Sequence, residues 1–182
     1  VLGAGFGGLE TSVALRPMRR AALREEVSAL IGIFNDAWAG NWAFVPFTPE
    51  EAEHLASELR PLLHDKLVWF AEAKGEPGAF AVCLPSLNDA IRDVSGRLLP
   101  FGWARLLWRL KVAGVRSARV PLMGVRRSLN GGLLGRVLPF FLVEAVRREA
   151  LALGIRRVEM SWMLEDNAAM RHLTEAAGAR PC

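Results

Sequence analysis

The stretch from residue 118 to residue 162 constrains the fold most, because it predicts two strands joined by a glycine-rich loop and a long helix. The segments 118–125 (ARVPLMGV) and 157–162 (RVEMSW) are short apolar or alternating runs, which are typical of strands. Pro139 is tolerated only in a first helical turn, so the helix between them is expected from about 135 to 153, and an earlier start would kink it. Strand, helix and strand in this order form a βαβ unit with parallel strands. The sequence therefore predicts an α/β or α+β protein with a mixed sheet.

The remaining segments predict helices and an antiparallel hairpin around this unit. Apolar residues at three- and four-residue steps predict a helix over 21–38, and TPEE at 48–51 is typical of a helix start. Other predicted elements are a strand over 10–16, a helix over 49–62, a hairpin of 66–73 with 77–84, a short helix over 86–94, an apolar and basic helix over 99–112, and a last helix from 166 to 178.

The composition fits one domain that works inside the cell. The chain has 182 residues, 52% of them hydrophobic, which suffices for a single buried core. Its net charge of +4 favours anionic partners. Cys83 and Cys182 form no CxxC pair, and the three histidines share no ligand spacing, so we expect no disulfide and no metal. No apolar run approaches the ~20 residues that span a bilayer, and no signal peptide is visible. These features predict a cytoplasmic protein without a membrane partner.

Two glycine-rich segments compete as a phosphate site. Residues 3–8 (GAGFGG) match the G-x-G-x-x-G pattern, and VLGAGFGGLETSVALR at 1–16 resembles the opening of FAD- and NAD-dependent pyridine nucleotide oxidoreductases. Only two residues precede these glycines, and the acid expected for a ribose falls at Glu25 or Glu26, inside a helical pattern. We therefore expect residues 1–10 to be a tail, 11–182 to be the domain, and neither FAD nor NAD to bind.

The second glycine-rich segment is 124–135 (GVRRSLNGGLLG), between a predicted strand and the long helix. Free amides at a helix N-terminus can bind phosphate oxygens, and Arg126, Arg127 and Arg136 add positive potential. The alternative is that these glycines serve only the turn between strand and helix.

This segment, followed by the long helix and by RVEMSWMLEDNAAMRHLTEAAGAR, resembles the second half of a GNAT-family N-acyltransferase, with a bacterial-like first half in LREEVSALIGIFNDAWAGNWAFVPFTPEEAEHLASEL. The likeness covers about residues 11–180. It implies a mixed, mostly antiparallel sheet with a central splay, flanked by helices, and acetyl-CoA or another acyl-CoA as co-substrate. The pyrophosphate signature falls on Asn130, Gly131, Gly132, Leu133, Leu134 and Gly135. Asn130 replaces the usual Arg or Gln, and Leu133 replaces the usual central glycine.

The resemblance also implies where acyl transfer would take place. The oxyanion donor is a backbone amide of Met123, Gly124 or Val125. Asn167 would lie near the pantetheine arm, although it also suits a helix cap. Thr174 stands where the family often has the tyrosine that protonates the leaving thiolate, and no tyrosine occurs in the chain.

A general base is expected at Glu159, because strand alternation separates it from Val158 and Met160. The alternative for Glu159 is a solvated or ion-paired acid near Arg156 or Arg157. The aromatic run 41–47 and the basic helix 99–112 are expected to contact substrate.

These expectations favour an enzyme that moves an acyl group from acyl-CoA to a small-molecule or peptide amine. The alternatives are an acyl-CoA-binding module without catalysis and a fragment of an oxidoreductase. Nucleic acid is not expected as a partner. The family normally adds a last strand beyond the residues seen here, and an unpaired sheet edge predicts a homodimer.

Overall fold

The computed structural model describes residues 13–60, 63–91, 104, 106, 108, 114–161, 168–176 and 178–180. Five strands form one sheet in the order β1 to β5. The first four are antiparallel neighbours, and β5 runs parallel to β4. The strands are β1 (Val13–Pro17), β2 (Val68–Ala73), β3 (Glu76–Pro85), β4 (Ser117–Val125) and β5 (Arg157–Met160). The mixed, mostly antiparallel sheet flanked by helices confirms the predicted fold class.

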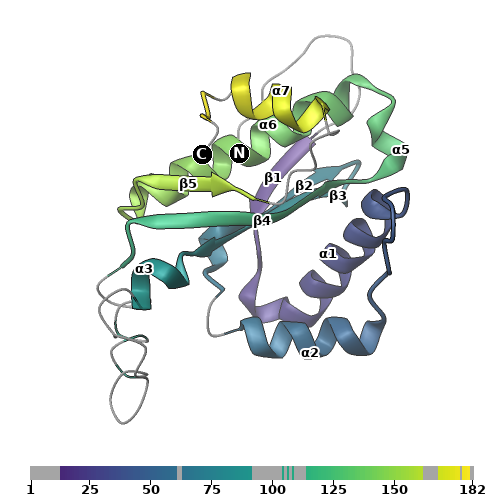
Figure 1. Ribbon diagram of the computed structural model, residues 1–182. Helices are drawn as coiled ribbons and strands as arrows, with labels where there is room; N and C mark the ends of the chain where they lie inside the picture. Colours follow the sequence, from purple (N-terminus) through teal and green to yellow (C-terminus); the bar gives the residue numbers. More distant parts are fainter. Residues whose placement is uncertain are drawn as a thin grey trace.

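Helices cover both faces of this sheet (Figure 1). On one face lie α1 (Leu23–Trp38) and α2 (Pro49–Leu59), and on the other lie α6 (Leu133–Ala152) and α7 (Ala168–Ala176). Short helices complete the connections: η1 (Arg20–Ala22), η2 (Asp65–Leu67), α3 (Leu87–Ile91) and α5 (Arg127–Asn130).

Each face of the sheet has its own apolar core, because alternate residues of β2 and β3 point to opposite sides. Phe70 and Phe80 are fully buried against α1. The neighbouring alanines of the same strands, which include Ala71 and Ala79, face α6 and its buried Leu138. Small residues on this face let the long helix lie close to the strands.

Several local predictions are confirmed. The Thr48 hydroxyl accepts from the Glu51 amide at 3.2 Å, and the Glu51 carboxylate accepts from the Thr48 amide at 2.9 Å, so α2 begins with a complete capping box. The β2–β3 hairpin turns through Lys74 and Gly75, both with positive φ. The parallel pair β4–β5, connected through α6, is the predicted βαβ unit.

The expected start of the long helix is wrong by two residues. α6 begins at Leu133 and not at Gly135, so Pro139 lies inside it. Proline has no amide hydrogen, and the Gly135 carbonyl therefore lacks its usual donor four residues later. Burial of Leu138 and Leu142, on either side of the proline, stabilises the helix against this loss.

Some predicted segments lie outside the described residues. These are the tail 1–10 with its glycine pattern, almost all of the helix expected over 99–112, and Asn167.

A buried carboxylate joins α1 to the first strand. Glu26 is 2% exposed and accepts from the Arg16 guanidinium at 2.6 Å and from Arg19 at 2.7 and 2.8 Å. Arg16 also pairs with Glu72 of β2 and lies over the Phe70 ring. Burial alone would raise the pKa of Glu26, but the hydrogen bonds from the two arginines outweigh it and hold that pKa below its ordinary value.

Candidate functional site

The candidate site lies where β4 extends beyond its pairing with β5. The recorded pairs run from Ser117 with Arg157 to Val120 with Met160, and the Ser161 amide donates to the Val120 carbonyl at 3.1 Å. Within the described part of the chain, β4 continues for five more residues, to Val125, with β3 as its only strand partner. Among the described residues, the end of β4 therefore has no strand along the side that faced β5, and we call this side the open end of β4.

A β-bulge at Pro121 marks this separation. Val82 of β3 pairs with Leu122, and Leu84 of β3 pairs with Arg119. Between these two pairs β3 has one residue and β4 has two, so β4 carries one extra residue. Proline has no amide to donate to a neighbouring strand and is placed in sheets at bulges or edges. Pro121 thus ends regular pairing at the point where the opening begins.

The bulge also decides which amides point into the opening. The Arg126 amide donates to Gly78 of β3 at 2.8 Å, so by strand alternation the Gly124 amide also points to β3. The amides of Met123 and Val125 then point the other way. The Met123 carbonyl agrees with this direction, because it accepts from the Trp38 indole of α1 at 3.5 Å. Of the three predicted oxyanion donors, the geometry favours Met123 and Val125 over Gly124.

The start of α6 supplies a second group of free amides beside the end of β4. Gly132 is its N-cap, no side chain caps it, and its first turn contains no acid. The first four amides of a helix have no partner within the helix, so those from Leu133 onward are available to an anion. Leu133 adopts helical φ and ψ, and none of the loop's glycines has positive φ. Leucine at 133 therefore keeps its amide in place without backbone strain.

Close packing of α5 on α6 requires a glycine at position 135 but not at position 131. A Cβ at Gly135 would lie 2.5 Å from the Leu129 carbonyl oxygen and 2.6 Å from the Asn130 Cα, both backbone atoms. A Cβ at Gly131 would meet nothing within 4 Å. Gly135 thus lets α5 pack on the first turn of α6, while Gly131 borders open space.

Asp36 of α1 fixes this loop from the other face of the sheet. Its carboxylate accepts from the Arg127 amide at 2.7 Å and from the Arg127 side chain at 3.4 Å. The backbone hydrogen bond from Arg127 is the main reason that the pKa of Asp36 is lowered. The Arg126 side chain donates to the Pro77 carbonyl at 3.1 Å. Two of the three arginines expected to attract phosphate therefore also hold the loop, and Arg136 is exposed in the first turn of α6.

The loop between α1 and α2 borders the same end of the sheet. Asn35 holds it by two hydrogen bonds, donating to the Phe47 carbonyl at 2.9 Å and accepting from the Phe47 amide at 3.0 Å. The rings of Phe44 and Phe47 pack on Phe34 with centroids 5.6 and 5.7 Å apart. The predicted substrate loop 41–47 is thus anchored beside β4 through α1.

Glu159, the expected base, forms an ion pair across the two parallel strands. Its carboxylate lies 3.0 Å from the Arg119 guanidinium, and its side chain is 37% exposed. Val158 and Met160 pack toward α6, so Glu159 lies on the α1 face of β5, as alternation predicts. Its partner is Arg119, and not Arg156 or Arg157, because Arg119 is directly opposite in the strand register.

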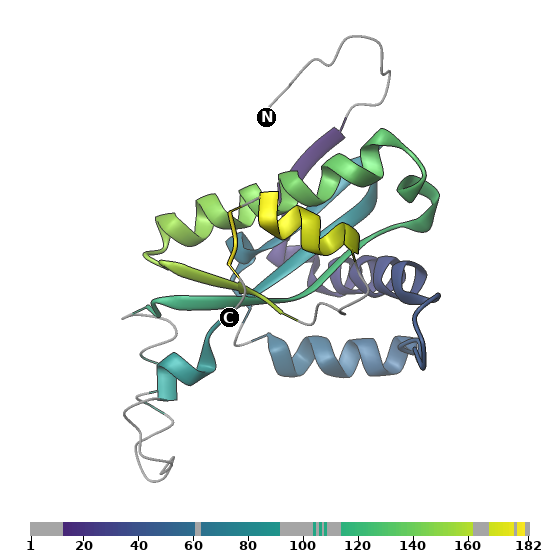
Figure 2. The same cartoon turned by 45° about the horizontal axis from the view of Figure 1, so that its top comes forward.

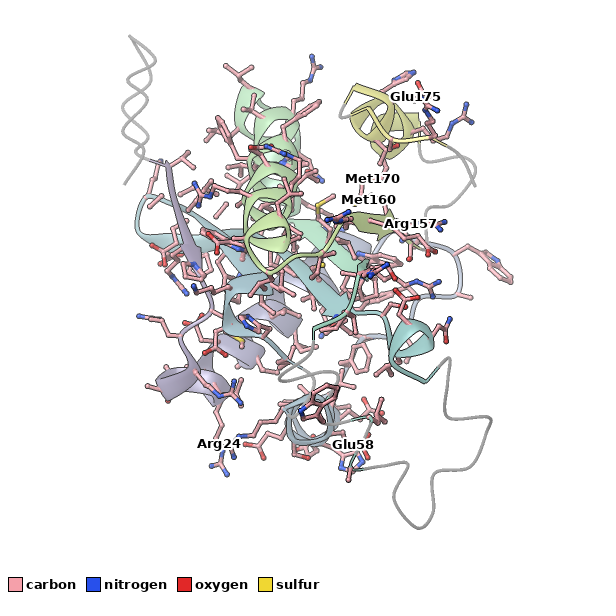
Figure 3. The ribbon with its side chains drawn as sticks, turned by 90° about the vertical axis from the view of Figure 1, so that its left-hand side faces the viewer. Arg24, Glu58, Arg157, Met160, Met170 and Glu175 are labelled. Carbon is pink, nitrogen blue, oxygen red and sulfur yellow. The ribbon has the colours of Figure 1, made fainter. Side chains whose placement is uncertain are left out.

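Thr174 is buried in α7 beside a cavity of about 220 Å³ between α6, α7 and the β4–β5 pair. Val120, Val146 and Met160 contribute to its mostly apolar lining. In Figure 3, Met160 of β5 and Met170 of α7 lie between the sheet and α7. The Thr174 hydroxyl donates to the Arg171 carbonyl at 2.8 Å, so its proton is engaged within its own helix.

Other reactive side chains do not form a site. Burial raises the pKa of the Cys83 thiol to about 12, which keeps it a protonated core residue. The described residues contain no group of three or more metal-ligating side chains. None of the helices in the described part of the chain is both long and apolar enough to cross a membrane.

Three residues that position the site were not singled out from the sequence. Pro121 could have been found, because proline is unexpected inside a central strand. Asp36 and Asn35 carry no local signal. Each acts on a residue that only folding brings near, at separations of 91 and 12 positions.

Comparisons with known proteins agree with this architecture. No protein-family model matches the sequence. The chain is 48% identical over 171 residues to the bacterial ceramide synthase of Caulobacter vibrioides, covering 94% of this chain and 44% of that protein. It is 46% identical over 169 residues to protein YghO of Escherichia coli, covering 93% of this chain and 43% of that protein. The chain spans less than half the length of these curated relatives.

Solved structures show the same fold at low sequence identity. The aminoglycoside N-acetyltransferase AAC(6')-Iy in complex with CoA superposes with a TM-score of 0.60 at 15% identity, covering 96% of this chain and 91% of that one. A ribosomal-protein-alanine N-acetyltransferase from Brucella melitensis superposes with a TM-score of 0.54 at 14% identity, covering 95% of this chain and 94% of that one. The chain thus has the fold of the GNAT acyltransferases. None of these proteins is named as a flavin or nicotinamide oxidoreductase, so the resemblance of residues 1–16 finds no support.

Proposed function

We propose that this chain binds an acyl-CoA and transfers its acyl group to an amine. The observation that carries the proposal is the uncapped start of α6, whose free amides lie next to the open end of β4. A diphosphate on the helix start would leave the thioester end of the co-substrate beside Met123 and Val125. A structure of the same fold holds CoA, which supports this choice of donor.

The acceptor we propose is a long-chain amino alcohol, and the acyl donor a fatty acyl-CoA. A ceramide is the amide of these two components, and a protein 48% identical over most of this chain is called a bacterial ceramide synthase. The match covers 44% of that relative, so we carry its acceptor over to this chain only as a proposal.

The transfer needs few groups from the protein. The neutral amine nitrogen attacks the thioester carbon, forming a C–N bond while the carbonyl electrons move to oxygen. The Met123 and Val125 amides would donate to this oxyanion. Collapse breaks the C–S bond, and the thiolate leaves with the electron pair. One proton leaves nitrogen and one joins sulfur, so protons balance between amide and thiol.

Glu159 is our candidate for receiving the proton from nitrogen, because it lies on the α1 face of β5. Glu159→Gln should then lower turnover by at least about a hundredfold while leaving acyl-CoA affinity unchanged. Glu53→Gln, at an exposed position on α2, is the matched control. Equal turnover in the two variants would contradict a role of Glu159 as the general base and would leave it only its ion pair with Arg119.

Thr174 stays a candidate for protonating the thiolate, although its hydroxyl already donates to Arg171. Thr174→Val replaces the hydroxyl by a methyl group on the same branched side chain and so removes the proton donor. Unchanged turnover in this variant would assign the proton to solvent or to the amine. Acyl-CoA binding by the wild-type protein without any turnover would favour the second candidate function, an acyl-CoA-binding module.

The decisive experiment is titration calorimetry with acetyl-CoA and with a long-chain acyl-CoA. Gly131→Asp places a carboxylate at the phosphate site, where space is open, and should weaken binding at least about tenfold by charge repulsion. Gly131→Ala is the matched control and should bind as the wild type does. No binding by the wild type, or equal binding by both variants, would contradict the proposed site. Gly135 is unsuitable for this test, because any side chain there meets backbone.

A further inference from the structure

The α1–α2 loop holds two large apolar side chains in solvent. Trp42 is 96% exposed and Val45 is 79% exposed, the two highest values among the large apolar side chains in the described part of the chain. Phe44 and Phe47 of the same loop point inward and pack on Phe34. Packing of the loop therefore does not account for Trp42 and Val45.

The loop is built to hold these side chains outward. Asn35 fixes its end at Phe47 with two hydrogen bonds, and the Asn41 amide donates to the Trp38 carbonyl at 2.9 Å. Ala43, between Trp42 and Phe44, has a φ of 55°, which is unfavourable for a residue with a Cβ. Such strain persists where the surrounding structure enforces it, and it is common at functional positions. Here it places Trp42 and Phe44 on opposite sides of the loop.

A third exposed apolar side chain and two arginines lie at the same end of the molecule. Figures 1 and 2 both show the α1–α2 loop and α5 at the same end of the molecule, and the bond from the Arg127 amide to Asp36, near the end of α1, joins the two regions. Leu133, where α6 begins, is 59% exposed, and Arg127 and Arg136 on either side of it are exposed. We call Trp42, Val45 and Leu133, with these two arginines, the rim patch.

We propose that the rim patch docks the protein onto a lipid surface containing anionic headgroups. Tryptophan is suited to such an interface, because its ring is apolar while its N–H stays hydrated. Exposed arginines attract anionic lipids, and the net charge of +4 acts in the same direction, although Asp36 pairs with Arg127 and offsets part of its charge. Glu50 and Glu51, which follow the loop, oppose this attraction, but the Glu51 carboxylate is engaged in the capping box of α2.

The contact is peripheral and needs no spanning segment, so it differs from the sequence-based expectation of no membrane partner. It would turn the open end of β4 and the start of α6 toward the lipid. A long-chain amine and a fatty acyl-CoA both partition into bilayers, so the docked protein would meet both substrates there. Only this last step rests on the proposed function, because docking itself requires no turnover.

Vesicle co-sedimentation of the purified protein tests the proposal directly. The probes are phosphatidylcholine vesicles with and without phosphatidylglycerol, at low and at high salt. We expect binding to the anionic vesicles, and we expect Trp42→Ala/Val45→Ala to lower the partition coefficient by about tenfold or more. Leu151→Ala is the matched control, because Leu151 is also exposed, at 53%, and lies at the other end of α6 from the rim patch. Equal urea midpoints would show that all variants are folded.

Each other outcome overturns the proposal. No binding by the wild type, or equal binding by the double variant, would leave Trp42 and Val45 without a membrane role. Sedimentation velocity tests whether a second copy of this chain binds the rim patch instead of lipid. A dimer that dissociates in the double variant would show that the rim patch is a self-association surface. Titration of the wild-type protein with acetyl-CoA in the absence of lipid tests the proposed function separately, because it involves neither vesicles nor a change in the loop. A failure of docking is thereby distinguished from a failure of the proposed function.

Discussion

Glu26 shows how a single residue connects three elements of this fold. Removing its charge would leave the Arg16 guanidinium partly buried between β1, α1 and β2 without this partner. We expect Glu26→Gln to lower the free energy of unfolding by about 3 kcal/mol, as when one member of a buried ion pair is lost. Glu25→Gln, at the exposed neighbouring position, should change it by less than about 0.5 kcal/mol. Urea denaturation would measure both, and equal values would contradict the assigned role.

The same carboxylate makes stability depend on pH. Because its pKa is lowered in the folded state, Glu26 stabilises the fold above the ordinary glutamate pKa of about 4.3 and loses this effect as the pH falls through its folded value. The stability difference between wild type and Glu26→Gln should therefore be constant near neutral pH and shrink in acid. Urea midpoints over a series of acidic buffers would check this, and a difference that grows on acidification has the wrong sign.

At the scale of elements, the contact between α5 and α6 gives shape to the proposed phosphate site. Gly135→Ala places a methyl group against backbone atoms that cannot rotate away. We expect it to destabilise the protein by about 1–3 kcal/mol, the range for overpacked positions. Gly131→Ala, where space is open, should not, and thermal unfolding would compare them. Similar unfolding temperatures would mean that α5 moves easily on α6.

The junction between α1 and α5 is the other element contact on which the site depends. Asp36→Ala removes the acceptor of the Arg127 amide and should weaken acyl-CoA binding several-fold, because α5 loses the side chain that caps it. Asp36→Asn retains an acceptor oxygen and should recover most of the affinity. Calorimetry on both variants would distinguish capping from charge, since a pure charge effect would change the affinity by the same amount in both, and would raise it for an anionic ligand.

For the whole molecule, the sheet edge bears on assembly. Among the described residues, β5 has a strand neighbour on one side only. An exposed edge can pair with another chain, so a homodimer stays a prediction. Sedimentation velocity over a range of concentrations would check it, and a monomer at all concentrations would contradict it. A dimer formed through β5 should persist in the Trp42→Ala/Val45→Ala variant, because the rim patch lies on other elements.

Most of the fold could be predicted from local patterns. Helical spacing in 23–38, the capping box at Thr48 and the turn at Lys74–Gly75 each depend on residues a few positions apart. The start of α6 was predicted incorrectly, because burial of Leu138 and Leu142 stabilises a helix through Pro139 that local rules disfavour.

The sequence by itself predicted the five strands, the longer helices in their order, the parallel β4–β5 pair and the glycine-rich start of α6, but not the short helix α5. Only the tertiary structure decided how the site is oriented. The bulge at Pro121 is defined by register with β3, Arg119 meets Glu159 across two strands, and Asp36 reaches Arg127 from a helix 91 positions away. These contacts depend on packing between distant segments. A local pattern cannot contain them, because it holds no information on which segments become neighbours.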